Sequence, residues 1–194
     1  MGFHAEARSH RELTHRVVVL DIETTGLMPQ RGHRIIEIGA VALQENQVIA
    51  EFQSLIHVQG RMPRQAQQIH GISDEMLQKS PGPDIVLPQF YEFIRQSTLV
   101  AHNAKFDMVF LRYEMRRFQL SLPHPTICTL KLSRKRYPFL PNHRLETVAR
   151  HLFGKLPNGI KRHRALDDAR LAAKVWLAMC GEKVKQPWED KTDG

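Results

Sequence analysis

The stretch VVVLDIETTG, residues 17–26, decides the fold and sets the first candidate site. Its apolar, mostly β-branched beginning is typical of a strand buried on both faces, and we predict a strand over residues 16–21. Asp21 and Glu23 stand two apart, so their side chains point to the same face of an extended chain. Open α/β sheets carry their sites at the carboxyl ends of strands, which makes this pair a candidate site. A solvated acidic strand end is the alternative, because the D-x-E pattern is short and common.

A second candidate acid lies at the start of a predicted helix. Residues 98–101 (TLVA) indicate a short strand, and a turn follows at residues 102–104. The apolar pattern of the next segment predicts a helix over residues 105–118, with Asp107 in its first turn. The predicted apolar stripe consists of Phe106, Val109, Phe110 and Tyr113. An acid at this position also interacts favourably with the helix dipole, so a purely structural role for Asp107 is the alternative.

The third candidate group is the sequence HRALDDA, residues 163–169. We predict a helix over residues 165–179 that holds Asp168 rigidly, whereas His163 precedes it on a Gly- and charge-rich stretch, residues 158–164. A fixed acid and a more mobile histidine suit a metal ligand and a general base, respectively. The H-x-A-x-x-D-A spacing selects Asp168, and Asp167 is interpreted as its solvated neighbour. The alternative for His163 is membership of a basic loop.

Together these acids predict a metal centre. Carboxylates that converge raise one another's pKa, which is tolerable only when cations neutralise them, and oxygen ligands favour Mg²⁺ or Mn²⁺. Two such ions about 3.5–4 Å apart can hold the attacking and leaving oxygens of a phosphodiester. In this scheme Asp21 bridges both ions, while Glu23 and Asp168 complete the first site. Asp107 holds the second ion, and neutral His163 takes the proton of the attacking water.

The sequence resembles the DnaQ-like 3′–5′ exonucleases, in the histidine-bearing DEDDh branch of the DEDD superfamily. This group includes the proofreading epsilon subunit of bacterial DNA polymerase III and RNase T. The likeness covers residues 16–181, and none of the positions that the family requires to be acidic or histidine is substituted. Besides the acidic motifs it rests on TTGL (24–27), RIIEIGAV (34–41), IHGIS (69–73), ICTLKLSRKRYP (127–138) and LETVARHLFG (145–154).

The resemblance implies a ribonuclease H-like fold and a site for the terminal nucleotide. The backbone around Thr24, Thr25 and Gly26 is then expected to hold that nucleotide. Leu27 and His70 are expected to pack against its base or sugar. The same resemblance adds Asn103 and Phe106 to the substrate-binding residues.

We therefore expect a metal-dependent 3′–5′ exonuclease that releases nucleoside monophosphates from single-stranded DNA, in proofreading or repair. An RNA-trimming exoribonuclease of the same branch is the first alternative, because the motifs are shared and only a contact to the 2′-hydroxyl would separate the two. A non-catalytic nucleic-acid-binding protein on this fold is disfavoured, since it should have lost an acid or the histidine. A DNA polymerase is a further candidate partner.

Composition agrees with a nucleic-acid partner. The chain has 194 residues and a formal net charge of +8 despite its acidic motifs, which suits a polyanion. Positive charge gathers in residues 131–136 and 161–164, and on the helix that follows Asp107. The residues on that helix are Arg112, Arg116 and Arg117.

The sequence also predicts a cytoplasmic location. It contains no apolar run long enough to span a membrane, no apolar signal-peptide core, and Glu6 where a myristoylation signal needs Ser or Thr. Cys128 and Cys180 lie in apolar segments without a CxxC spacing, so we expect buried thiols in a reducing compartment.

The pattern along the chain predicts an exonuclease domain over residues 15–181, between a flexible segment (1–14) and a polar tail (182–194). Three successive strands followed by alternating helices and strands indicate a mixed five-stranded sheet flanked by helices, of the α/β class. The predicted strands are residues 16–21, 35–43, 51–57, 98–101 and 127–128, with a hairpin turn at Glu45 and Asn46. Further helices are predicted at residues 63–69, after a cap at Asp84, and at residues 145–153.

Overall fold

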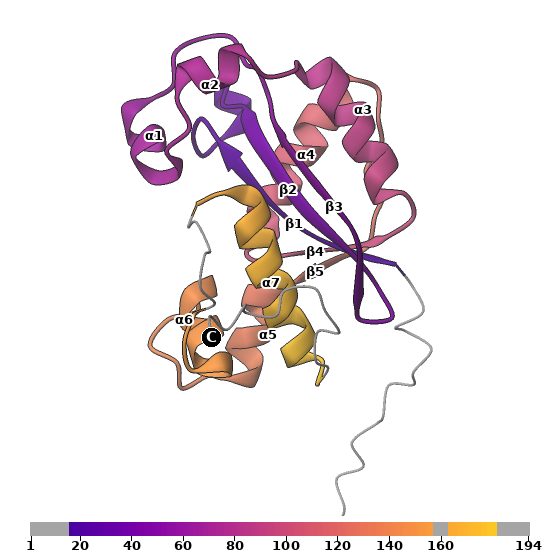
Figure 1. Cartoon of the computed structure of the whole chain (residues 1–194), viewed down its shortest axis with the longest axis vertical. Helices are drawn as coiled ribbons and strands as arrows, with labels where there is room; N and C mark the ends of the chain where they lie inside the picture. Colours follow the sequence, from indigo (N-terminus) through magenta and orange to yellow (C-terminus); the bar gives the residue numbers. More distant parts are fainter. Residues whose placement is uncertain (1–15, 157–162, 182–194) are drawn as a thin grey trace, which may run out of the picture.

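The computed structural model describes residues 16–156 and 163–181 and contains a mixed five-stranded sheet (Figure 1). The strands are β1 (Val17–Thr24), β2 (Ile35–Gln44), β3 (Gln47–Leu55), β4 (Thr98–Ala101) and β5 (Thr126–Cys128). Their order is β3-β2-β1-β4-β5, so β1 is the central strand. It pairs antiparallel with β2 and parallel with β4, which in turn pairs parallel with β5. The predicted α/β architecture is thereby confirmed.

Helices cover both faces of this sheet (Figure 1). They are α1 (Arg64–His70), α2 (Asp74–Gln78), α3 (Pro83–Ile94), α4 (Lys105–Arg117), α5 (Thr129–Arg136), α6 (Leu145–Phe153) and α7 (Ala165–Met179), with a short 3-10 turn, η2 (Pro29–Arg31). One core lies between the sheet and α3 and α4, and includes Leu20 and Phe90. A second core lies between the opposite face and α7, and includes Val19 and Ala172.

The alternation of side chains along β1 assigns its two acids to one face. Val18, Leu20 and Ile22 belong to the core against α3 and α4, whereas Val19 belongs to the core against α7. Side chains two residues apart share a face, so Asp21 and Glu23 continue the side that faces α7. The acids therefore end an apolar row whose burial fixes the register of the strand.

α6 and the segment that joins it to α5 pack against α7 in a separate small core. Val148 and Ala149 of α6 contact Leu171, Val175 and Met179 of α7 there. The guanidinium of Arg136 also donates a hydrogen bond of 2.5 Å to the carbonyl oxygen of Met179. Both contacts fix α6 and the end of α5 beside α7.

Several sequence-based details differ from the structure. The third strand begins at Gln47 and not at Glu51, because Glu45 and Asn46 adopt φ angles of 51° and 64° and close a two-residue hairpin turn. α5 was not predicted as a helix, since its basic sequence TLKLSRKR has no continuous apolar stripe. The predicted cap at Asp84 is wrong: Gly82 precedes α3, and Asp84 lies within its first turn.

Three burial predictions are also wrong. Val109 and Tyr113 of α4 are exposed, because Met108, Leu111 and Met115 turn toward the sheet instead. Cys180 follows α7 and is exposed, whereas Cys128 is partly buried against the core.

Within the described ranges, the helices are too short or too polar to cross a membrane. The predicted terminal segments and residues 158–162 lie outside those ranges.

Candidate active site

The first acids of the site stand on the central strand. Asp21 and Glu23 both lie within β1, which extends to Thr24 and so is longer than predicted. Both residues are partly exposed, while Ile22 between them is buried on the other face. The predicted side-by-side arrangement of the two carboxylates is therefore present.

Asp107 reaches the site from the first turn of α4 and is only 2 % exposed. The turn before it is fastened by His102, whose Nδ1 lies 2.9 Å from Thr129 Oγ1 and whose Nε2 lies 2.8 Å from the carbonyl oxygen of His143. Asn103 takes a left-handed φ of 68°, which redirects the chain into the helix. Because both sides of the turn are held, the position of Asp107 is fixed relative to β4 and β5.

Asp168 is positioned by the close approach of α7 to β2. Gly39 makes this approach possible, because a Cβ atom built there would lie 2.0 Å from the backbone nitrogen of Leu166. Beside it, the fully buried carboxylate of Glu37 accepts a hydrogen bond of 3.1 Å from the backbone N–H of Ala165. The side chain of Arg164 donates to the same carboxylate, with Nη2 at 2.7 Å. The first residues of α7 are thus held directly on the sheet.

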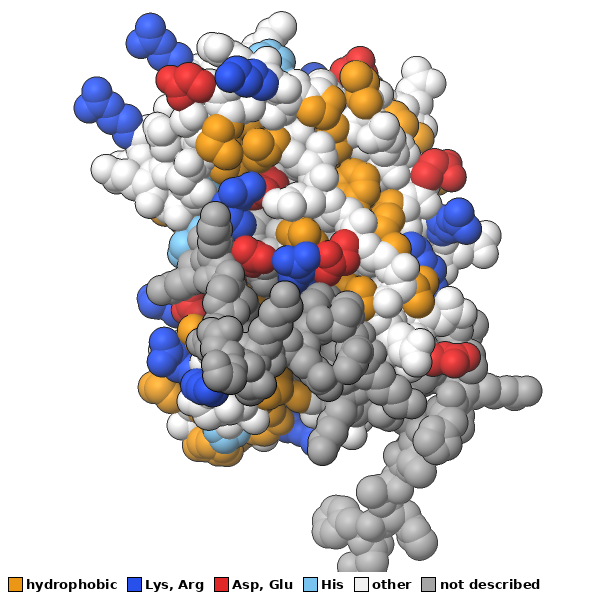
Figure 2. Space-filling model, viewed as in Figure 1, with side chains coloured by type: hydrophobic (Ala, Val, Ile, Leu, Met, Phe, Trp, Pro, Cys, Tyr) orange, Lys and Arg blue, Asp and Glu red, His pale blue; other side chains and the backbone are white. Residues whose placement is uncertain are grey.

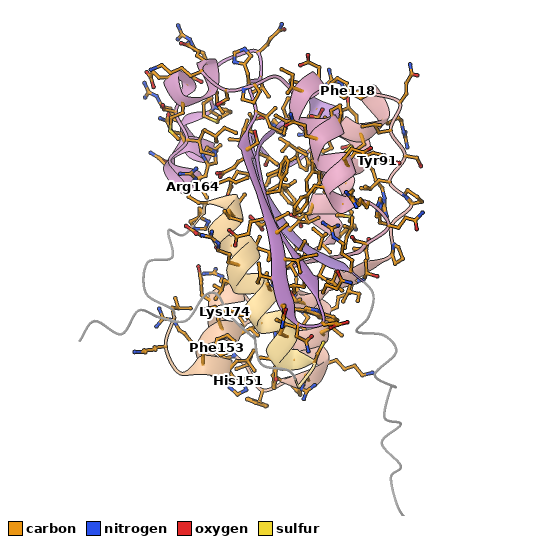
Figure 3. The ribbon with its side chains drawn as sticks, turned by 45° about the vertical axis from the view of Figure 1, so that its right-hand side comes forward. Tyr91, Phe118, His151, Phe153, Arg164 and Lys174 are labelled. Atoms are coloured by element: carbon orange, nitrogen blue, oxygen red, sulfur yellow. The ribbon has the colours of Figure 1, made fainter. Side chains whose placement is uncertain are left out.

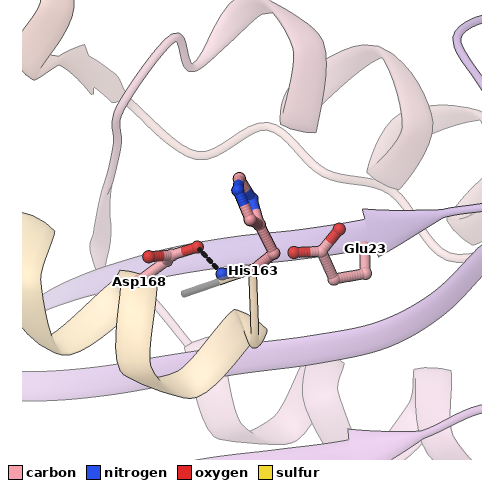
Figure 4. Close-up of side chains that lie close together, drawn as sticks. All are labelled: Glu23, His163 and Asp168. Atoms are coloured by element: carbon pink, nitrogen blue, oxygen red, sulfur yellow. Dashed lines mark hydrogen bonds between the residues drawn. The ribbon is translucent and has the colours of Figure 1, made fainter. Parts of the chain in front are cut away.

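Glu23, His163 and Asp168 come together in the structure (Figure 4). Each offers one ligand atom, and these atoms all lie within 4.8 Å of one another. The backbone N–H of His163 donates a hydrogen bond of 3.1 Å to Asp168 Oδ2. His163 has a φ of 57°, a left-handed conformation that is uncommon for non-glycine residues, although Asn, Asp and His adopt it more often than the others. The turn before α7 therefore places the histidine beside both acids.

Removal from water raises the pKa of every acid in this group, and repulsion by the other acids of the group adds to the rise for Asp21 and Glu23. Burial, followed by the charges of Asp107, Asp168 and Glu23, raises the pKa of Asp21 well above its usual value. Burial and then Asp168 raise the pKa of Glu23 to about 8. Burial raises the pKa of Asp107 to about 7 and that of Asp168 to about 6. These shifts show that the four carboxyl groups share one environment.

This donor set fits divalent metal ions. Four carboxylates in one environment are costly without a cation, and oxygen donors favour hard ions such as Mg²⁺ and Mn²⁺. Glu23 and Asp168 are already close enough to hold one ion together, with a ring nitrogen of His163 beside them. Asp21 lies two residues before Glu23 on the same strand face, and its pKa is raised by both Asp107 and Asp168. The acids on β1, α4 and α7 therefore form a candidate metal centre.

The loop after β1 is built from the predicted substrate residues. The hydroxyl of Thr24 donates a hydrogen bond of 2.7 Å to the carbonyl oxygen of Gly26. Two hydrogen bonds between Thr25 and Arg34 close the base of the loop. The backbone N–H of Thr25 donates to the carbonyl oxygen of Arg34 at 2.9 Å, and the backbone N–H of Arg34 donates to the hydroxyl oxygen of Thr25 at 2.9 Å. Gly26 lies against His33, because an added Cβ would be 2.7 Å from that ring. The loop is therefore tightly closed at its base.

The remaining predicted substrate residues differ in their surroundings. Leu27 is 76 % exposed at the tip of the loop, and Asn103 is exposed beside Asp107. His70 is buried at the end of α1, where its Nδ1 accepts from the Ile72 N–H at 3.0 Å. Its Nε2 then carries the proton, and this buried donor has no hydrogen-bond partner in the described part of the chain. The ring of Phe106 packs on that of Phe110, with their centroids 5.1 Å apart, and against the core. Phe106 therefore has a structural role as well as the predicted role in substrate binding.

Two buried glutamates, Glu37 and Glu114, join the elements of the site and are absent from the residues predicted above. Glu37 holds the start of α7, as described, and Glu114 of α4 accepts from Arg34 Nε at 2.5 Å and Nη2 at 2.9 Å. For Glu37 the sequence carries a signal, because an acid within the apolar strand IIEIGA must be buried and therefore needs a partner. Arg164, one residue of the predicted basic cluster 161–164, thus forms a salt bridge with Glu37 inside the protein.

Comparison with known proteins agrees with this geometry. The sequence model of an exonuclease family, RNase T, matches residues 18–176, from β1 into α7. The chain belongs to this exonuclease family. The matched range contains all four acids and the histidine, so the exonuclease is of the predicted DnaQ-like, histidine-bearing type, a hydrolase of phosphodiester bonds. Families of this type use divalent metals, in keeping with the donor set described above.

Two kinds of polymerase component are similar in sequence to this exonuclease. The DNA polymerase III subunit epsilon of Rickettsia typhi is 40 % identical over 175 residues, which cover 86 % of this chain and 74 % of that protein. A PolC-type DNA polymerase III of Clostridium perfringens is 37 % identical over 169 residues, which cover 87 % of this chain. The chain spans about a tenth of the length of such PolC-type polymerases.

Solved structures confirm the ribonuclease H-like fold. Exonuclease X, determined with 5′ overhanging duplex DNA, superimposes with a TM-score of 0.68 at 27 % identity, over 89 % of this chain and 97 % of that chain. The nuclease domain of 3′hExo, determined with rAMP, gives a TM-score of 0.75 at 18 % identity, over 92 % of this chain and 98 % of that chain. The second likeness shows the fold alone.

Proposed function

We propose that this exonuclease removes nucleoside monophosphates from the 3′ end of single-stranded DNA. The observation that carries the proposal is the meeting of Glu23, His163 and Asp168 within 4.8 Å, in one electrostatic environment with Asp21 and Asp107. Two divalent ions held by the four carboxylates would stabilise negative charge on the attacking and leaving oxygens. Mg²⁺ and Mn²⁺ are the ions that suit these donors.

His163 is assigned proton transfer in this reaction. An imidazole nitrogen accepts a proton from the attacking water, whose oxygen forms a bond to phosphorus while the bond from phosphorus to the 3′ oxygen breaks. The leaving oxygen takes up a proton, and the products are a nucleoside monophosphate and a shortened strand. Asp168 supports this role, because it accepts the backbone N–H of His163 and so fixes the histidine beside Glu23.

The terminal nucleotide is assigned to the surface between the Thr24–Leu27 loop and His70. Leu27 offers an exposed apolar side chain, and His70 offers a buried N–H donor without a partner. An apolar contact for a base and a donor for a phosphate or sugar oxygen are the two interactions that a terminal nucleotide needs. This assignment favours single-stranded or frayed ends, since a paired base is held in its stack.

The relatives support a role in DNA replication. Both similar groups of proteins named above are components of DNA polymerase III, so we propose proofreading or repair, with a polymerase as partner. RNA trimming is the rival function, because the same four acids and histidine serve either sugar.

A turnover assay on matched single strands tests the proposal. DNA and RNA of the same sequence, labelled at the 5′ end, are incubated with the protein in Mg²⁺ or Mn²⁺, and the products are separated by length. A ladder that shortens from the 3′ end, faster on DNA, is expected, and Asp21→Asn should abolish it. Release of the 5′ label first, efficient cutting of closed circles, or faster hydrolysis of RNA would contradict the respective part of the proposal.

A further inference from the structure

An aromatic cluster on the α5–α6 unit is not used by the site described above. Phe139 lies between α5 and α6 and is 70 % exposed. Its ring contacts those of Tyr137 and His151 at centroid distances of 6.3 and 5.3 Å, in both cases at an interplanar angle of 74°. Tyr137 and His151 also contact each other, at 4.7 Å. These three residues, here called the aromatic cluster, hold their rings in a preformed arrangement.

The cluster stands on a rigid support. Tyr137 and Leu140, on either side of Phe139, pack against the core that joins α6 to α7. The backbone N–H of Tyr137 donates to the carbonyl oxygen of Ser133 at 2.8 Å, and Ser133 Oγ lies 3.1 Å from His143 Nδ1. The ring of Phe139 is therefore presented to solvent by a segment that is anchored before and after it.

The surface around the cluster has one sign of charge. Residues 129–156 contain seven Lys and Arg and a single acid, Glu146. All seven basic residues are exposed, and one carboxylate cannot neutralise them. Figure 2 shows Lys and Arg side chains beside hydrophobic ones in the lower left part of the molecule, where Figure 1 places α6. A partner of this surface should therefore be a polyanion.

Exposed aromatic rings among cations suit one class of polyanion best. Single-stranded nucleic acids stack their bases on such rings while Lys and Arg follow the phosphates. A duplex keeps its bases stacked inside, and the centre of a protein interface is usually depleted of Lys. The combination therefore favours a single strand over a duplex or a protein.

The cluster lies on the path away from the active site. His102, in the turn before Asp107, contacts the carbonyl oxygen of His143, so the segment before α6 adjoins that turn. Leu145, the first residue of α6, packs against the core between the sheet and α7, so the start of this helix lies beside the helix that carries Asp168. The nine residues of α6 then span about 13 Å toward His151 and Phe153, which lie far from Arg164 in Figure 3. A strand whose 3′ end occupies the site would meet the cluster only several nucleotides upstream.

We propose that the aromatic cluster stacks on an upstream base of the single strand whose 3′ end is being hydrolysed, while the surrounding Lys and Arg contact its phosphates. The proposal rests on the proposed function for the direction of the strand. It assigns Phe139 to affinity for long strands and not to chemistry. The cluster would thus hold a strand between successive rounds of hydrolysis.

Substitutions at Phe139 separate stacking from bulk. Phe139→Leu keeps an apolar side chain without a π face, whereas Phe139→Trp keeps the π face. Ile85→Ala on α3 removes a control side chain that is 50 % exposed on another part of the surface. KM and kcat are measured for a trinucleotide and for a single strand of about 16 nucleotides, as DNA and as RNA. Thermal unfolding confirms that each variant is folded.

Phe139→Leu should raise KM for the long strand by about 5–150-fold, which is the equivalent of about 1–3 kcal/mol of stacking. The kcat for the long strand should not change, and neither should KM and kcat for the trinucleotide. Phe139→Trp and Ile85→Ala should match the wild type. Equal KM values for wild type and Phe139→Leu on the long strand would overturn the proposal, and so would an equal loss on the trinucleotide.

A binding measurement distinguishes this proposal from the proposed function. Fluorescence anisotropy of the labelled long strand in EDTA reports affinity without hydrolysis. Binding that depends on Phe139 in a protein without 3′ hydrolysis would support the cluster and overturn the function. Hydrolysis from the 3′ end without any effect of Phe139 on affinity would support the proposed function and overturn the role of the cluster.

Discussion

Asp21, Glu23, Asp107 and Asp168 have a raised pKa in the metal-free protein, and each raised pKa makes the free energy of unfolding depend on pH. Between its ordinary pKa and its raised pKa, each group binds more proton in the folded state than in the unfolded chain. The folded state is therefore favoured at low pH and loses this advantage as the pH rises. A bound cation removes the repulsion and should reverse the loss.

The metal-free protein should consequently melt at a lower temperature as the pH rises from about 5 through the raised pKa of Glu23, which is about 8. Mg²⁺ or Mn²⁺ should raise the melting temperature more at the upper end of this range than at the lower end. Asp21→Asn should flatten the pH dependence and stabilise the metal-free protein. Thermal unfolding in EDTA and in each metal measures all three effects, and a metal-free melting temperature that rises with pH would refute the assignment.

The two neighbouring acids at the start of α7 should differ in their effect on activity. Asp168 shares the environment of Glu23 and His163, whereas Asp167 accepts a hydrogen bond of 3.2 Å from Arg170 on its own helix. Asp168→Asn should remove nearly all activity, because metal binding and geometry fail together. Asp167→Asn should be mild in the same assay. An equally severe loss in both variants would contradict the assignment of Asp168, and not Asp167, as the metal ligand.

His163 should be required for turnover more than for metal binding. Its left-handed φ of 57° makes Asn a better replacement than Ala, because Asn tolerates this conformation and cannot accept the proton. His163→Asn should lower kcat by about 10²–10⁴-fold, the usual range for a lost general base. Calorimetric titration with Mn²⁺ should give nearly the wild-type affinity. A loss of affinity as large as that of Asp21→Asn would make His163 a ligand.

At the scale of elements, the contact between β2 and the start of α7 decides where His163 and Asp168 lie. Glu37 accepts from Gln53, Arg164 and the backbone of Ala165, so its carboxylate joins β3, the loop and the helix. Removing charge there leaves the helix start less firmly held, and small displacements of catalytic groups are costly. We therefore predict that Glu37 is a positioning residue for the reaction.

Glu37→Gln should lower kcat by about 10–100-fold, the range seen when partners of metal ligands are changed, with little effect on KM. Hydrogen exchange of the Ala165 and His163 amides should accelerate in the same variant. Arg170→Gln is the matched control, since it breaks an arginine–glutamate pair between α7 and β3 whose side chains are 35 % and 28 % exposed. If both variants lose activity equally, the pair with Arg164 has no special role.

Most elements could be predicted from the sequence because their patterns are local. The run before Asp21 and the helices beginning at Lys105, Leu145 and Ala165 lie where predicted. α5 could not be predicted, because it packs beside α7, where Arg136 donates to the carbonyl oxygen of Met179, 43 residues further along the chain. The same holds within the site: the acids follow from motifs, whereas the partner of Glu37 lies 127 residues away and only folding identifies it.

At the scale of the whole molecule, positive charge surrounds an acidic centre. The chain carries a net charge of +8, and much of its exposed charge lies on the α5–α6 unit. Affinity for a single strand in EDTA should therefore fall with salt, with a log–log slope of about −0.7 for each phosphate that is neutralised. Anisotropy titrations over a range of salt measure this slope. A flat response would exclude the basic surface from binding.

The central position of β1 determines the order in which the parts of the sheet unfold. β3 and β5 are the edges of the sheet, and β5 has only three residues, whereas β1 is bonded on both sides. Amide protons at such edges exchange with solvent first, through local opening that leaves the middle closed. Mild denaturant should then unfold the edge strands first, and a protease should cut them first. The strand that bears Asp21 and Glu23 should meanwhile keep its hydrogen bonds to both neighbours. Loss of the chemistry should coincide with the final, cooperative collapse of the sheet.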